Sequence, residues 1–303
     1  MDPNWKEIRV ALIPASFVDS VVAIGSHPKG GNATWGASGF LYASLKGKVA
    51  SNNTYTTFLV TNRHVFDELK DPTACIRINP KGAGPAKEFA ITLADPGGGP
   101  FHFGHPNANV DVAAMPVDMH IPEKQGISAA LIKSDSDIST ISALATDGVA
   151  EGNLVYVLGF PMSLVGLERN TVIVRLGCIA SMQETLTNPH LPMLIDAPIF
   201  PGNSGGPVVL RGEPLAITGT KPQMRSTVIG VAASYLTYED VACSLQTGKP
   251  RVSFTENSGL SLVFSMDCVA EAVAYAESEI AKRPALAVSG RATPTAPAPA
   301  PTP

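Results

Sequence analysis

The sequence predicts an all-β protein with a single helix near its C-terminal end. Between about residues 20 and 265 the chain consists of short runs rich in β-branched, aliphatic and aromatic residues, each bounded by Gly, Pro, Asn or Ser. Many short strands separated by frequent turn signals are typical of barrels and sandwiches. Near the end the apolar residues change to helical spacing, which indicates one helix after the last strand.

The clearest predicted strands are residues 58–60, 154–160, 171–176 and 228–231. A connection of Ala-Asp-Pro-Gly-Gly-Gly-Pro at residues 94–100 can continue neither a helix nor a central strand. We therefore expect it on the surface.

The C-terminal helix is predicted over about residues 266–283, and Pro284 follows it as a stop signal. Its apolar stripe consists of Val269, Val273, Ala276 and Ile280. Residues 284–303 are almost wholly Pro, Ala and Thr, a composition that buries too little apolar area to offset its ordering entropy. We expect this tail to be disordered.

Charge and apolar runs argue against two kinds of partner. The chain has 303 residues, a net charge of −4 and a pI of about 5.9, so it lacks a broad basic face for nucleic acid or an anionic membrane. No uninterrupted apolar run is long enough to span a bilayer.

The N-terminus and the cysteines favour a cytoplasmic, reducing location. Residues 1–3 lack the cationic start of a secretory signal, and Pro14 and Asp19 interrupt the apolar stretch that follows. The 4 cysteines are far apart and form no C-x-x-C pair, so they predict neither a zinc knuckle nor a dense disulfide framework.

The sharpest motif is Pro-Gly-Asn-Ser-Gly-Gly-Pro at residues 201–207, directly before an apolar strand. Its glycines permit a tight turn that aims the amides of Gly202 and Ser204 into one pocket, as an oxyanion hole requires. Taken alone, the motif fits a purely structural turn equally well, and it also fits the nucleophile elbow of α/β-hydrolases.

The order of residues along the chain excludes that elbow. In α/β-hydrolases the acid and the histidine follow the serine, whereas all 6 histidines of this chain precede Ser204. The order His, Asp, Ser directs the search for a base to the first half of the chain.

His64 and Asp111 are the candidate partners of Ser204. His64 ends a β-rich run, where a loop could present its ring to a cleft, although a solvent-facing histidine would look the same. Asp111 lies in an apolar run, where a carboxylate is costly to bury unless it is paired, for example with a histidine Nδ1–H. Asp118 is the nearest alternative acid.

These segments together resemble the signatures of trypsin-like serine peptidases, in particular the HtrA (Deg) branch. The matching segments are Thr-Asn-Arg-His-Val around His64, Asp-Val-Ala at Asp111 and Asp-Ala-Pro-Ile-Phe-Pro-Gly-Asn-Ser-Gly-Gly-Pro around Ser204. The likeness covers roughly residues 17–282.

The resemblance implies two Greek-key β-barrels with the active site between them, followed by the C-terminal helix. It divides the chain into an N-terminal segment at 1–16 and a peptidase domain at 17–283, followed by the tail at 284–303. Within the domain we expect the first barrel at about 17–135, the second at about 136–264 and the helix at about 266–283.

The implied activity is endopeptidase hydrolysis of a protein or peptide substrate through an acyl-enzyme, without metal or organic cofactor. Ser204 would be the nucleophile, His64 the general base and Asp111 the residue that orients it. The amides of Gly202 and Ser204 would bind the oxyanion.

The predicted specificity pocket lacks a negative charge. In trypsins that cleave after Arg or Lys, the position six residues before the serine is acidic. In this chain that position is Pro198, and its neighbours Ile199 and Phe200 are apolar. We therefore expect a small or medium aliphatic P1 residue, with the opposite wall formed by Ala232, Ala233 and Ser234. Asn203 replaces the aspartate that pairs with a new N-terminus in zymogen-activated relatives, so activity is expected to be intrinsic or gated by loop ordering.

Two further features bear on partners. After the helix the chain is too short for the PDZ domain usual in the HtrA branch, and both an activating partner and a homo-oligomer stay open. His102 and His105 are interpreted as an incidental exposed pair, because no further metal ligands are evident around them.

Two rival functions remain open from the sequence. A peptidase scaffold that binds a peptide or protein without cutting it would keep the same fold, although it would commonly have lost one of the three residues. An esterase would use the same acyl chemistry on a different substrate.

Overall fold

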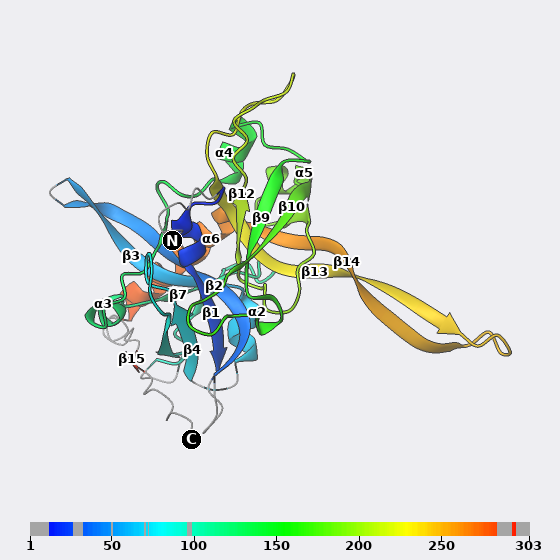
Figure 1. Ribbon diagram of the computed structural model, residues 1–303, viewed down its shortest axis with the longest axis horizontal. Helices are drawn as coiled ribbons and strands as arrows, with labels where there is room; N and C mark the ends of the chain where they lie inside the picture. Colours follow the sequence, from blue (N-terminus) through cyan, green and yellow to red (C-terminus); the bar gives the residue numbers. More distant parts are fainter. Residues whose placement is uncertain are drawn as a thin grey trace, which may run out of the picture.

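The computed structural model describes residues 12–26, 33–49, 51–69, 71, 73–95, 99–283 and 293–294 (Figure 1). The segment at 1–11 and, apart from 293–294, the tail at 284–303 lie outside the described residues. The predicted all-β class and the predicted C-terminal helix are both confirmed.

The N-terminal half and β15 of the C-terminal tail form a nine-stranded sheet. Its main path runs β15-β5-β4-β1-β2-β3-β7-β6, and β8 pairs in parallel with β2. The other pairings in this sheet are antiparallel. Its strands are β1 (Val21–Ser26), β2 (Thr34–Val49), β3 (Asn52–Thr61), β4 (Thr73–Ile78), β5 (Lys87–Thr92), β6 (Phe103–Gly104), β7 (Ala113–Pro116), β8 (Ile132–Lys133) and β15 (Thr293–Pro294).

The C-terminal half forms a closed six-stranded barrel in the order β10-β11-β14-β13-β12-β9. All of its pairings are antiparallel. Its strands are β9 (Leu154–Gly159), β10 (Ile173–Ser181), β11 (Met193–Asp196), β12 (Pro207–Leu210), β13 (Thr227–Cys243) and β14 (Pro250–Ser265). The second predicted barrel is thus closed, whereas the strands of the first follow an open path among the described residues.

Short helices connect the strands. They are α1 (Ala15–Asp19), α2 (Arg63–Glu68), α3 (His120–Lys124), α4 (Ile141–Thr146), η1 (Pro161–Ser163) and α5 (Gln183–Thr187). In the part of the chain that the structure describes, no helix is long and apolar enough to cross a bilayer.

The buried apolar residues form two clusters, one confined to the C-terminal half and a larger one that extends from the N-terminal sheet to barrel residues such as Leu158 and Val231. Phe40, Phe58 and Phe89 are fully buried on the N-terminal sheet, and Val208 and Ile229 are fully buried inside the barrel. Burying a side chain of this size stabilises the fold by about 1.5–3 kcal/mol. Because the larger cluster contains residues of both halves, it packs them against each other.

The long helix α6 (Met266–Lys282) joins the two halves. Ser265 caps its N-terminus, since the side-chain oxygen accepts a hydrogen bond from the Cys268 amide. The predicted stripe is confirmed, because Val269, Val273 and Ala276 are buried in the larger apolar cluster and Ile280 packs against it. The helix begins directly at the end of β14 of the barrel, so one continuous segment fixes the two halves together.

Strands β13 and β14 continue past the barrel as a two-stranded ribbon that projects from the body of the molecule (Figure 1). The pairing extends from Thr237 opposite Asn257 to Cys243 opposite Pro250. We call residues 236–257 the arm.

Candidate active site

His64 lies in the first turn of α2, three residues beyond the end of β3. The sequence indicated a loop here, but the chain turns directly into a short helix. Asn62 precedes the helix in an extended conformation, and its side-chain amide donates to the Asp111 carbonyl oxygen at 2.7 Å. The segment that carries the histidine is therefore tied to the segment that carries the aspartate.

The carboxylate of Asp111 holds His64 at two points. Oδ2 lies 2.6 Å from Nδ1 of the imidazole, and Oδ1 accepts the His64 backbone N–H at 3.0 Å. An ionised carboxylate can only accept, so Nδ1 carries the proton and Nε2 of a neutral ring is left as an acceptor. This is the tautomer that a general base requires.

The two groups shift each other's titration. The hydrogen bond from Asp111 raises the pKa of His64 above its ordinary value, and partial burial opposes this effect only in part. Burial alone would raise the pKa of Asp111, but hydrogen bonds from the His64 side chain and backbone hold that pKa below its usual range.

Ser204 lies in the turn between β11 and β12, and two glycines of this turn have backbone angles that favour glycine. Gly202 has φ +99°, and a Cβ there would lie 2.3 Å from the Phe160 carbonyl oxygen. Gly205 has φ +84°, and a Cβ there would lie 2.0 Å from Oγ1 of Thr61. The glycines of the motif therefore allow the serine loop to pack directly against the strand that leads to His64.

Ser38 of β2 ties this loop to the N-terminal half. Its amide donates to the Ser204 carbonyl oxygen at 2.9 Å, and its hydroxyl donates to the Gly202 carbonyl oxygen at 2.6 Å. The same hydroxyl accepts the Phe160 amide at 2.9 Å. Ser38 is fully buried, so these bonds are shielded from water.

The amides proposed for the oxyanion hole are not used inside the fold. The Pro201 carbonyl is held by the Met162 amide at 2.7 Å, and the Gly202 carbonyl is held by Ser38, which fixes the orientation of the loop. Within the described residues neither the Gly202 nor the Ser204 amide donates a hydrogen bond. Both are available to an oxygen atom of a ligand.

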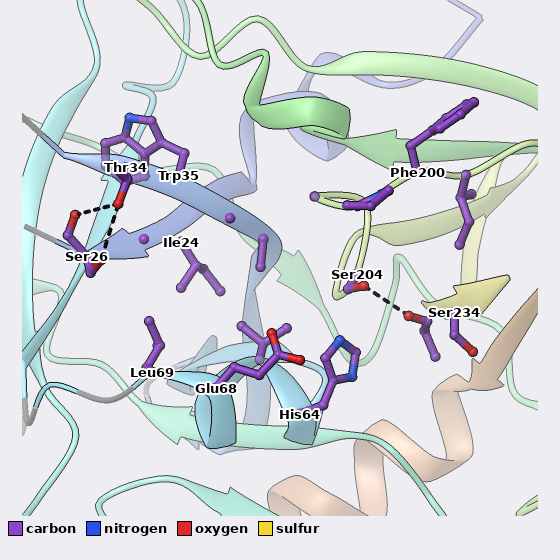
Figure 2. Close-up of a pocket in the computed structure, with 18 of the residues that line it drawn as sticks. Ile24, Ser26, Thr34, Trp35, His64, Glu68, Leu69, Phe200, Ser204 and Ser234 are labelled. Carbon is purple, nitrogen blue, oxygen red and sulfur yellow. Dashed lines mark hydrogen bonds between the residues drawn. The ribbon is translucent and has the colours of Figure 1, made fainter. Parts of the chain in front are cut away.

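The Ser204 hydroxyl does not donate to His64 in this structure. It donates to the Ala233 carbonyl oxygen on β13 at 3.0 Å, as the dashed line in Figure 2 shows. Ser204 and His64 nevertheless line the same cavity, which has a volume of about 570 Å³. Rotation of the serine side chain is needed to bring its hydroxyl to Nε2.

The cavity contains four of the six residues predicted for substrate binding. Ile199, Phe200, Ala233 and Ser234 line it, together with Pro201 and Tyr235. Pro198 is exposed and Ala232 is buried, and neither lines the cavity.

The side of the cavity that the N-terminal half forms around His64 was not predicted from the sequence. Ile24, Trp35, Val65, Glu68 and Leu69 line it, from the N-terminal half (Figure 2). Glu68 follows His64 by four residues on α2, a spacing that places the two on one helix face. Recognising that His64 begins a helix would therefore have drawn attention to Glu68.

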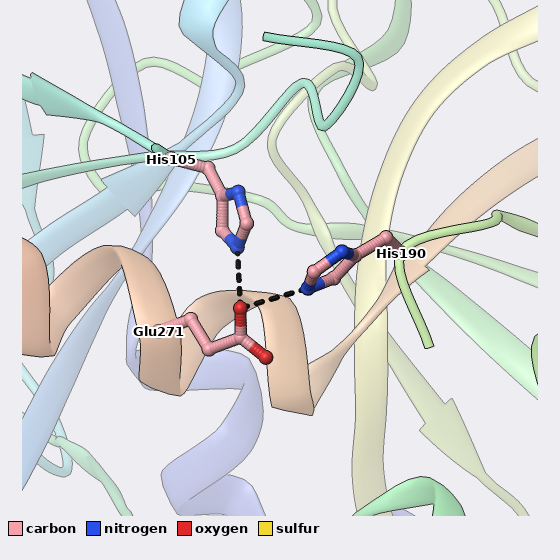
Figure 3. Close-up of side chains that lie close together, drawn as sticks. All are labelled: His105, His190 and Glu271. Carbon is pink, nitrogen blue, oxygen red and sulfur yellow. Dashed lines mark hydrogen bonds and ion pairs between the residues drawn. The ribbon is translucent and has the colours of Figure 1, made fainter. Parts of the chain in front are cut away.

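A second group of titratable side chains lies between α6 and the two halves. Nε2 of His105 and Nε2 of His190 both lie against one oxygen of Glu271, at 3.0 and 2.8 Å (Figure 3). His105 is 3% exposed. The interpretation of His105 as an exposed incidental residue is therefore wrong, because its ring is buried against α6.

The donor set of two imidazoles and a carboxylate is one that zinc accepts, and the three candidate atoms lie within 4.8 Å of one another. The hydrogen bonds do not fit a metal, however. The Asn107 amide donates to Nδ1 of His105 at 3.0 Å, so Nε2 of the neutral ring carries the proton and donates to Glu271. A metal ligand needs that nitrogen free, with Nδ1–H donating to an acceptor.

Comparisons with known proteins identify the family. No curated protein matches the sequence. Among solved structures, the crystal structure of the Rv3671c protease in an inactive form is similar, with 17% identity over 86% of this chain and 90% of that chain and a TM-score of 0.40. The trypsin-like peptidase domain family matches residues 37–217, which is more than half of the chain and includes His64, Asp111 and Ser204. The chain therefore belongs to the family of trypsin-like peptidase domains.

Proposed function

We propose that this protein is a serine endopeptidase, with Ser204 as nucleophile, His64 as general base and Asp111 as the residue that orients it. The observation that carries the proposal is the two-point hydrogen bonding of His64 by Asp111, with Ser204 on the wall of the same cavity. Family membership makes the substrate a protein or peptide.

The reaction begins when the Ser204 hydroxyl leaves Ala233 and turns to Nε2 of His64. His64 takes the hydroxyl proton while Oγ attacks the scissile carbonyl carbon, and Asp111 stabilises the imidazolium that results. The imidazolium then gives this proton to the leaving amine, and the C–N bond breaks to give an acyl-enzyme. Water, deprotonated by His64, hydrolyses the ester and restores the Ser204 hydroxyl.

The oxyanion of each tetrahedral intermediate is assigned to the amides of Gly202 and Ser204. Both are unused inside the fold, and the carbonyls that flank them are held by Met162 and Ser38. One such donor is worth about a hundred- to a thousandfold in rate.

The P1 side chain is expected to be small or medium and aliphatic. The barrel residues that line the cavity, among them Ile199 and Ala233, include no acid. Glu68, the acid that lines the cavity, comes from α2 of the N-terminal half and points toward His64 (Figure 2). An arginine or lysine side chain held between the barrel residues would therefore leave its charge without a partner there.

The test is hydrolysis of a peptide library with all residues varied at P1. We expect cleavage after Ala, Val or Leu by the wild type, none by Ser204→Ala, and unchanged cleavage by Ser44→Ala. Ser44 is the control because it is a serine on β2 that does not line the cavity. Cleavage mainly after Arg or Lys would contradict the assignment of the pocket.

A second candidate function is binding of a peptide or protein without hydrolysis. The observation that favours it is the hydrogen bond from the Ser204 hydroxyl to Ala233 instead of His64. Peptide binding by folded wild type without any product would support this alternative. Faster hydrolysis of esters than of every peptide would instead support an esterase.

The domain bounds, with the peptidase at 17–283, and a cytoplasmic location stay predictions.

A further inference from the structure

The arm carries two different faces. In an antiparallel pair, residues directly opposite each other point to the same side of the ribbon. The register therefore defines an aromatic face with Tyr238, Asp240, Ala242, Val252, Phe254 and Glu256. The polar face consists of Thr237, Glu239, Val241, Ser253, Thr255 and Asn257.

The aromatic face is open to solvent. Tyr238 is 58% exposed, Val252 is 53% exposed and Phe254 is 51% exposed. Tyr238 and Phe254 are diagonal neighbours across the two strands, a separation that aromatic side chains can bridge. A contiguous apolar surface of this kind, standing away from the body of the protein, marks a binding site.

One edge of the arm is also open. Strand β12 pairs with β13 only from Thr227 to Val231. Among the described residues, no strand pairs with residues 233–243 on the edge opposite β14. Such an edge presents backbone N–H and C=O groups to an added strand.

This open edge begins at the cavity. Ala233, Ser234 and Tyr235 of β13 line the cavity, and the Ala233 carbonyl accepts the Ser204 hydroxyl. The same strand then continues into the arm, with register shifts against β14 between Ala232 and Ser234 and between Tyr235 and Thr237. A polypeptide that adds to β13 beside Ser204 therefore reaches the aromatic face by following the same edge.

The charges of the aromatic face define the side chains that it fits. Asp240 and Glu256 lie on it, and it carries no basic residue. Apolar groups of a ligand would contact Tyr238 and Phe254, and lysine or arginine would be attracted by the two acids.

We propose that the arm binds the substrate itself, as an extended segment remote from the scissile bond, added to the β13 edge and carrying apolar and basic residues. This proposal rests on the proposed peptidase function. At a strand rise of about 3.3 Å per residue, a substrate needs roughly eight residues beyond the cavity to reach Ala242. The enzyme therefore selects unfolded chains or long disordered segments over short peptides.

The test compares peptides that share one cleavage sequence. The short peptide fills only the cavity, and two long peptides add about ten alternating apolar and basic residues, one before and one after that sequence. We expect one of the extensions to raise kcat/KM at least tenfold. The double variant Tyr238→Ser with Phe254→Ser should lose this gain and keep the wild-type rate on the short peptide.

The matched control is Val241→Ser, which removes an exposed apolar side chain from the polar face of the same strand. It should leave the gain intact. No gain from either extension, or the same loss in the control, would overturn the proposal. Circular dichroism and thermal unfolding check that each variant is folded.

Two further measurements separate the alternatives. If light scattering shows a wild-type dimer that the double variant abolishes, the arm binds a second copy and the proposal is wrong.

If the wild type cuts no peptide, the proposed function fails, and fluorescence anisotropy of the labelled long peptides then tests whether the arm binds them. This measurement compares Ser204→Ala with a triple variant that also carries Tyr238→Ser and Phe254→Ser. Tighter binding of one long peptide to Ser204→Ala than to the triple variant supports the arm site, and equal binding rejects it.

Discussion

His64 and Asp111 set the pH range in which the proposed chemistry can operate. The base must be neutral to accept the serine proton, and the hydrogen bond from Asp111 raises the pKa at which it loses its own proton. The acid limb of kcat/KM should therefore lie above the ordinary histidine value of about 6.5. A pH profile of peptide hydrolysis measures it, and a limb below pH 6 would contradict this assignment.

Replacing Asp111 by Asn removes the carboxylate that is the largest cause of this shift. The acid limb of Asp111→Asn should move to lower pH, and kcat should fall by about 10³–10⁴ because the wrong tautomer is favoured. Asp118→Asn is the control, since Asp118 caps the turn before α3 and makes no contact with His64 among the interactions described. An unchanged limb in Asp111→Asn would show that His64 is not the titrating base.

At the residue scale, motifs could predict His64, Asp111 and Ser204, because the reaction constrains residue type and order along the chain. Ser38 and Ala233 could not be predicted as contacts of the serine loop. They act through a hydroxyl and a backbone carbonyl that many sequences could supply, and only the fold brings them to Ser204. Pro198 was predicted to line the specificity pocket from its position in the motif, but it does not line the cavity.

At the scale of elements, Ser38 on β2 links the two halves through the serine loop. Removing its hydroxyl in Ser38→Ala leaves the Phe160 amide without its acceptor and frees the Gly202 carbonyl. We expect a loss of about 1–3 kcal/mol in the free energy of unfolding and at least a tenfold lower kcat with little change in KM.

Thermal unfolding and steady-state kinetics measure these two effects. Ser44→Ala, on the same strand but away from the site, should change neither. Wild-type kcat in Ser38→Ala would show that the loop keeps its orientation without this serine.

Glu271 on α6 provides a second link, because it accepts hydrogen bonds from His105 and His190. Burial alone would raise the pKa of Glu271, but the two imidazoles hold it below the ordinary value. A depressed carboxyl pKa contributes stability above the unfolded pKa of about 4.3, and this contribution is lost as the pH falls through the folded pKa.

At pH 7 the free energy of unfolding of Glu271→Gln should therefore be lower than that of the wild type. The loss should be less than about 1 kcal/mol, because the carboxylate is half-exposed. The difference should shrink below pH 4. The matched control is Glu123→Gln, an exposed acid on α3 whose ion-pair partner is also a histidine. A difference that does not depend on pH would contradict the role of the carboxylate charge.

Helices and strands were predicted best where their buried apolar residues recur at a regular spacing or in a continuous run. Helix α6 has an uninterrupted stripe, and strands such as β9 and β12 are continuous apolar runs. Helix α2 has only six residues and follows β3 almost without a break, so its local pattern continues that of the strand. The arm alternates aromatic, acidic and polar residues without a buried face, so the sequence did not distinguish it from a surface loop.

At the scale of the whole molecule, the site is assembled from two halves that share one large apolar cluster, while the C-terminal half has a second cluster of its own. His64 and Asp111 belong to the segment of the N-terminal sheet, and Ser204 and Ala233 belong to the barrel. Their relative position depends on this shared cluster, on Ser38 and on α6. The sequence could predict this arrangement only through resemblance, because no local pattern encodes the contact between residues so far apart in the chain.

The arm lies outside both apolar clusters, and it should be dispensable for the fold. Replacing residues 238–256 by a short turn should preserve the thermal unfolding temperature within a few degrees, since these side chains are mostly exposed. Cleavage of a short peptide should also be preserved. A collapse of stability would show that the arm packs on the body of the protein.

The most direct test of the central claim is covalent labelling by a fluorophosphonate, with the modified residue identified by mass spectrometry. The account predicts one adduct, on Ser204, that is lost in Ser204→Ala and slowed by several orders of magnitude in His64→Ala. Folded wild-type protein that stays unlabelled, or an adduct on another serine, would contradict it.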